Sequence, residues 1–66
     1  MNVSYIVTTL ADREFDHDFN YVSVIDSHYE DEETLYVIDV ELDESNAPRY
    51  EDELSQDSAV VAYKAN

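Results

Sequence analysis

The chain has 66 residues, of which 17 are Asp or Glu and three are Lys or Arg, so its formal net charge is −14. It contains neither cysteine nor glycine. These counts exclude disulfide bonds, thiolate zinc sites, glycine-rich phosphate loops and EF-hand loops, and the sign of the charge excludes direct binding to nucleic acid or anionic lipid. Because 44% of the residues are hydrophobic, we expect a single small folded domain, residues 1–66.

Residues 3–9, VSYIVTT, are rich in β-branched and aromatic side chains and predict the first strand. The segment 10–19 is compatible with a short helix that has Leu10, Phe15 and Phe19 on one side, with a polar loop, or with an extended hairpin arm. Residues 20–26, NYVSVID, predict a second strand, and residues 27–32, SHYEDE, predict a turn or loop.

Residues 33–42, ETLYVIDVEL, have the clearest strand pattern in the chain. Tyr36, Ile38, Val40 and Leu42 alternate on one face, as in a half-buried strand. The other face combines Leu35 and Val37 with Asp39 and Glu41. Apolar surface next to acidic side chains is typical of an interface, and a homodimer is one arrangement that would use it.

Residues 43–57 contain the single proline and predict either a short helix or a disordered acidic loop. In the helical interpretation Asn46 is the N-cap, Pro48 lies in the first turn, and Tyr50 and Leu54 pack on the sheet at i, i+4 spacing. Residues 58–64 predict the last strand. The expected fold is α+β or mostly β: a small antiparallel sheet of about four strands with one or two short helical segments.

The sequence offers little for catalysis or for metal binding. His17 and His28 lie beside acids, but DHD at 16–18 alternates sides when extended and does not make a ligand face. A short chain without glycine or cysteine rarely forms the pocket that a nucleophile and an oxyanion hole need. We therefore expect no catalytic residues, no metal and no cofactor. The N-terminal segment has no basic start and only a short apolar stretch, which predicts a soluble cytoplasmic protein without a membrane segment.

The carboxylates are the remaining candidates for a function. Duplex DNA carries one charge per about 1.7 Å of its axis, so fourteen net charges correspond to roughly 24 Å of duplex. A compact domain of this length has a radius of gyration of about 11 Å and a diameter a little under about 30 Å, which predicts a linear charge density like that of DNA. Alternate acids on the strand 33–42 would form a fixed row about 6.7 Å apart. The expected partner-binding residues are these acids, their neighbouring acidic blocks and two tyrosine anchors: Asp26, Glu30, Asp31, Glu32, Glu33, Asp39, Glu41, Asp43, Glu44, Glu51, Asp52, Glu53, Tyr29 and Tyr50.

In size, in charge and in the absence of cysteine, the chain resembles the small acidic DNA-mimic inhibitors of bacteriophages and mobile elements. The resemblance implies binding to a basic, DNA-binding protein, such as a restriction, CRISPR, repair, nucleoid or transcription protein, in the cytoplasm of the host cell. Two alternatives stay open. One is an acidic regulatory module that binds a basic protein surface without imitating DNA, and the other is a small protein adapted to high salt.

Overall fold

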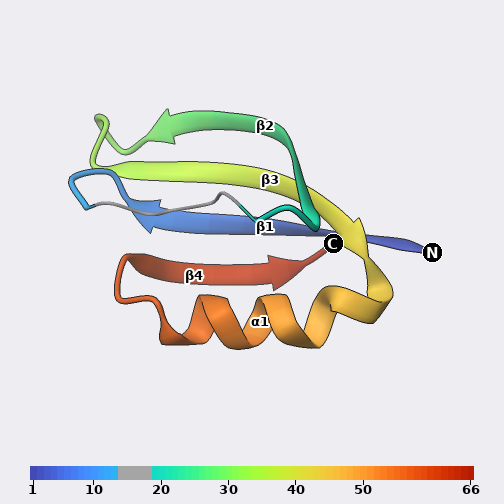
Figure 1. The fold of residues 1–66 in the computed structure, drawn as a ribbon. Coiled ribbons are helices and arrows are strands. Elements are labelled where there is room, and N and C mark those ends of the chain that lie inside the picture. The colour runs from blue at the N-terminus through green and yellow to red at the C-terminus, as the bar shows by residue number, and fades with distance from the viewer. Residues whose placement is uncertain (14–18) are drawn as a thin grey trace.

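The computed structural model describes residues 1–13 and 19–66 and shows a four-stranded antiparallel sheet with one short helix (Figure 1). In chain order the elements are β1 (Asn2–Leu10), β2 (Val22–Glu30), β3 (Leu35–Asp43), the 3-10 turn η1 (Glu44–Asn46), α1 (Ala47–Gln56) and β4 (Val60–Ala65). The strand order is β2-β3-β1-β4, and each strand is antiparallel to its neighbours. The expected fold class is therefore confirmed.

The helix α1 connects β3 to β4 across β1. Since β3 and β4 are both antiparallel to β1, they run parallel to each other and need such a crossover. Asn46 precedes the helix and Pro48 lies in its first turn, where the missing backbone N–H leaves no bond unmade. Tyr50 and Leu54 are the buried residues of α1 and face the sheet. The helix expected within residues 43–57 is confirmed and the loop interpretation is wrong, but Asn46 holds the N-cap position without a side-chain capping hydrogen bond.

The hydrophobic core lies between α1 and one face of the sheet. Tyr5 and Val7 of β1 and Val40 of β3 are among its buried members, together with Ile38, Leu42, Tyr50 and Leu54. The rings of Tyr5 and Tyr50 meet edge to face with centroids 5.6 Å apart, an arrangement that aromatic pairs favour. The alternating apolar residues of β3 face this core, as their spacing predicts.

The second strand lies further along the chain than predicted. Residues 27–30, expected to form a turn, belong to β2, and the hairpin loop is residues 31–34. Pairing with β3 extends β2, because the Tyr29 ring packs against the Tyr36 ring at a tilt, with centroids 4.8 Å apart, and Ser27 accepts a 2.7 Å hydrogen bond from the Tyr36 hydroxyl. The register shifts between Val24 and Asp26, which marks a bulge at Ile25.

The hairpin loop has left-handed backbone at three consecutive acidic residues. Asp31, Glu32 and Glu33 have φ angles of 52°, 55° and 67°, a region that glycine usually occupies. Thr34 stabilises the loop, because its backbone N–H and its hydroxyl both donate to the Asp31 carbonyl, at 3.1 and 2.6 Å. A chain without glycine therefore makes this turn with strained acidic residues.

The interpretations offered for residues 10–19 fall mainly on 14–18, outside the described residues. At the ends of that segment, Leu10 is the last residue of β1 and Phe19 packs against the core. In the described part of the chain, no helix has the length and apolar character that crossing a membrane requires.

Candidate protein-binding surface

The face of the sheet that points away from α1, here called the open face, carries the acidic row expected from the sequence. Cross-strand partners share a face, so the register places Asp26 of β2 directly opposite Asp39 of β3. On the other side of Asp39 lies Ile6 of β1, followed by Lys64 of β4. Two carboxylates are therefore neighbours on the open face. The cation in this row, Lys64, is separated from Asp39 by the strand β1.

The Asp39 side chain is half-buried, and its Oδ1 is enclosed without a hydrogen-bond partner among the described residues. A polar atom in that position costs free energy, because it has lost water and gained no replacement. The carboxylate of Asp26 cannot supply a donor when it is ionised. A hydrogen-bond donor from another molecule would satisfy the Asp39 Oδ1.

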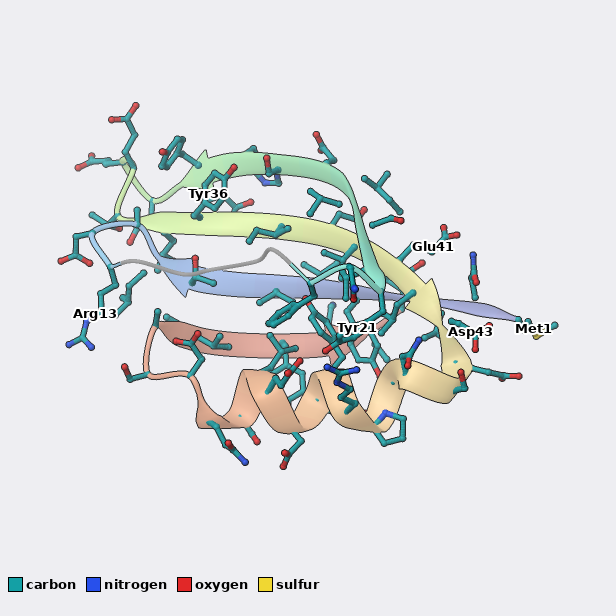
Figure 2. The ribbon with its side chains drawn as sticks, viewed as in Figure 1. Met1, Arg13, Tyr21, Tyr36, Glu41 and Asp43 are labelled. Carbon is teal, nitrogen blue, oxygen red and sulfur yellow. The ribbon has the colours of Figure 1, made fainter. Side chains whose placement is uncertain are left out.

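Further along β3, two more acids occupy the same face near the N-terminus of the chain (Figure 2). Asn2 donates a 2.6 Å hydrogen bond to Glu41. Asp43 caps the turn η1, where the side chain and the backbone N–H of Ser45 donate to it and hold its pKa below the usual value for Asp. The N-terminal ammonium lies 3.5 Å from Asp43 and 3.8 Å from Glu44. Local contacts thus order this end of the row.

The other end of β3 leads back into the acidic hairpin loop. Glu30 ends β2 and lies 3.0 Å from the His28 ring, while the three left-handed residues that follow are exposed. In Figures 1 and 2 this loop and the Glu41–Asp43 end occupy opposite ends of the sheet. The acids expected at residues 26–44 therefore run along the length of β2 and β3.

The helix acids do not extend this row, contrary to expectation. Glu51 and Glu53 lie on α1, on the core side of the sheet, where they accept hydrogen bonds from the hydroxyls of Tyr5, at 3.0 Å, and Tyr21. Burial, followed by the bond to Glu53, raises the pKa of Tyr21 to about 12. Asp52 is exposed on the same helix and accepts a hydrogen bond from Gln56. These carboxylates fasten the helix layer or face solvent away from the row.

Of the two expected tyrosine anchors, one is exposed and one is not. Tyr29 is 59% exposed on β2. Tyr50 is completely buried between α1 and the sheet, so its expected role as an exposed anchor is wrong. Tyr50 and Leu54 have i, i+4 spacing, so both pack on the sheet. A ring that fills the core cannot also contact a partner.

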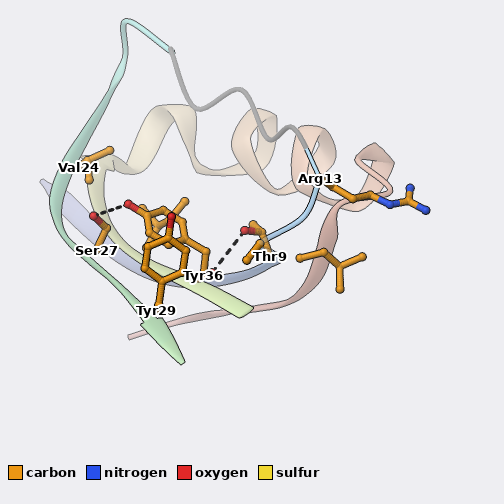
Figure 3. A pocket seen from close by; sticks show the side chains of 9 residues that line it. Thr9, Arg13, Val24, Ser27, Tyr29 and Tyr36 are labelled. Carbon is orange, nitrogen blue, oxygen red and sulfur yellow. Dashed lines mark hydrogen bonds between the residues drawn. The ribbon is translucent and has the colours of Figure 1, made fainter. Parts of the chain in front are cut away.

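The sequence did not point to a second exposed feature, the apolar surface around β2. Val24 is 51% and Ile25 56% exposed, although both lie in a strand. Val24 and Tyr29 line a pocket of about 230 Å³ on the core side of the sheet, together with Thr9, Leu10, Ala11, Arg13, Ser27, Tyr36 and Ile38 (Figure 3). The adjacent apolar pair Val24-Ile25 breaks the alternation of β2 and was the available signal for the bulge and for this exposure.

Within the described residues the carboxylates are poorly neutralised. The ion pairs there use the N-terminal ammonium, Glu30 contacts the His28 ring, and none of these contacts involves a Lys or Arg side chain. The radius of gyration, 11.3 Å, agrees with the expected value, but the longest dimension is 35 Å, so fourteen net charges over 35 Å give one per 2.5 Å. The linear charge density is therefore about two-thirds of that of duplex DNA, and the expected equality is corrected.

No group of three or more His, Asp or Glu side chains in residues 1–13 and 19–66 is arranged to hold a metal ion. No protein-family model, curated protein or solved structure matches the chain. The geometry of the open face and of β2 must therefore support any assignment of function.

Proposed function

We propose that this chain is a DNA-mimic protein that binds a basic, DNA-binding protein and occupies its DNA site. The observation that carries the proposal is the pair Asp26–Asp39, two carboxylates opposite each other on the open face, where one oxygen of Asp39 has no hydrogen-bond partner in the described part of the chain. Like charges directly opposite on a sheet destabilise the fold. A guanidinium or ammonium group from a partner would offset that cost, because it supplies both the charge and the donors.

The arrangement of the remaining acids supports the same function. The row begins in the hairpin loop, follows β3 and ends at Glu44 in η1, so the backbone of the sheet fixes the spacing of the acids on β3. A groove that binds phosphates presents Lys and Arg side chains, which can also bind carboxylates. A chain with a net charge of −14 would be steered to such a groove rapidly, and the association would weaken as salt increases. The proposal places the protein in the cytoplasm with its target and assigns it no catalytic activity.

Capture and displacement test the proposal. The tagged chain is immobilised, exposed to host-cell lysate, and eluted with either a salt gradient or duplex DNA at constant salt. We expect a DNA-binding protein to be captured and to be released by duplex DNA. The double variant Asp39→Asn, Glu41→Gln should capture at least ten-fold less of it. The matched control Asp52→Asn, Glu53→Gln removes the same charge from α1 and should capture as much as the unaltered chain.

Two results would count against DNA mimicry. A captured protein that duplex DNA does not release would indicate an acidic regulatory module, which binds a basic surface outside the DNA site. A chain that captures nothing and unfolds at low salt would indicate adaptation to a saline solvent, because its own charges would then need high salt for screening.

A further inference from the structure

The strand β2 forms one edge of the sheet and is the most exposed strand in the described part of the chain. Residues 23–30 are all exposed, and β2 pairs with β3 alone among the described elements. Its outer side therefore presents a row of backbone N–H and C=O groups over nine residues, about 30 Å of strand. The edge contains neither proline nor lysine, two residues that commonly protect exposed edges from pairing.

The opposite edge of the sheet is better protected. The strand β4 has six residues, carries Lys64, and is irregular where Thr8 and Thr9 of β1 pair with it. The bulge in β2 lies near its beginning, between Val24 and Asp26, and leaves residues 26–30 in regular register with β3. Of the two edges, β2 is thus the one on which a further strand would pair.

The two faces of β2 differ in chemistry. On the open face it presents Asp26, His28 and Glu30, and on the core side it presents Val24, Ser27 and Tyr29. Figure 3 shows the Tyr29 and Tyr36 rings beside each other in the pocket, with Ser27 bonded to the Tyr36 hydroxyl. A strand added at this edge would place alternate side chains beside the acids and the others beside Val24 and Tyr29.

We propose that β2 receives an extended segment of the partner as a fifth strand, and that this segment alternates basic with apolar side chains. Its basic side chains would lie beside Asp26 and Glu30, and its apolar side chains would cover Val24 and Tyr29. This inference rests on the proposed function for the basic character of the partner. Charge also favours such a segment over a second copy of this chain, because a second copy would bring another −14 and place acids against acids.

The test uses a defined probe, the acetylated and amidated peptide Lys-Val-Lys-Val-Lys-Val, added to the isotopically labelled chain. We expect NMR to show Hα–Hα contacts between the peptide and β2, and slower amide exchange at residues 26–30. A peptide with the same side chains but N-methylated backbone amides keeps its charge and loses its strand donors, and it should bind at least ten-fold more weakly. Tyr29→Ser should weaken binding several-fold, whereas Val61→Ser, at a 54% exposed position on β4, should not change it.

Equal binding of the N-methylated peptide would overturn the proposal, because charge alone would then account for the affinity. Peptide contacts confined to β4 would also overturn it, as would self-pairing of the chain through β2 in the absence of peptide. The DNA-displacement experiment is independent of this one. If duplex DNA releases the captured target but the peptide does not pair with β2, mimicry stands and strand addition fails. If the peptide pairs with β2 but DNA releases nothing, strand addition stands and mimicry fails.

Discussion

Removing the charge of Asp39 should make the fold more stable, although Asp39 is half-buried in the central part of the sheet. Its carboxylate lies opposite Asp26, where Cβ atoms are about 5 Å apart. Two unit charges about 6 Å apart repel by about 0.7 kcal/mol at the dielectric constant of water. The unpartnered Oδ1 adds a desolvation cost of about 1 kcal/mol, part of which a neutral amide still carries. We expect Asp39→Asn to raise the free energy of unfolding by about 1 kcal/mol.

Thermal unfolding followed by circular dichroism measures this effect, since about 1 kcal/mol shifts the Tm of a small domain by about 4–8 °C. Asp12→Asn is the matched control, because it removes one charge from an exposed turn residue and reports the general benefit of a smaller net charge. The excess of Asp39→Asn over this control should diminish in 1 M salt, where charges are screened. If Asp39→Asn is no more stable than Asp12→Asn, Asp26 and Asp39 do not destabilise the fold. The observation on which the proposed function rests would then be refuted.

Three further predictions concern the fold. Glu33→Gly should be about 1 kcal/mol more stable than Glu33→Ala in urea unfolding, because both lose the charge and only glycine adopts a φ of 67° without strain; equal stabilities would contradict a left-handed loop. Burial raises the pKa of Tyr21 from 10.0 to about 12, so the unfolded chain loses this phenolic proton at a lower pH than the folded chain, and the free energy of unfolding should fall between pH 10 and 12. Tyr21→Phe should reduce that fall, and an unchanged pH profile of stability would contradict the raised pKa of Tyr21. Leu54→Ala should cost about 2–5 kcal/mol and largely unfold a domain of this size at low salt, as circular dichroism would show, whereas a folded variant would contradict the helix packing.

The sequence predicted the elements whose patterns are local. The alternation of Tyr36, Ile38 and Val40 identified β3 and the face it buries. The spacing of Tyr50 and Leu54, with proline in the first turn, identified α1. In both cases the hydrophobic periodicity of one segment identifies the residues that pack, and a single sequence shows that periodicity.

Features that depend on pairing between distant segments could not be predicted. Ser27 and His28 have the polar character of a turn, and they become strand because β3 offers Ile38 and Val37 as partners. The opposition of Asp26 and Asp39 depends on the bulge at Ile25, since a shift of one residue would turn Asp26 to the other face. The acidic row was thus predictable along β3, while its most strained pair and the exposed edge of β2 were not.

Competition for DNA on the purified target tests the proposed function most directly. Fluorescence anisotropy of a labelled duplex bound to the captured DNA-binding protein would be measured while this chain is added. DNA mimicry predicts stoichiometric release of the duplex, with at least ten-fold more of the Asp39→Asn, Glu41→Gln variant needed and no change for the Asp52→Asn, Glu53→Gln control. A stable ternary complex of target, duplex and this chain would contradict it.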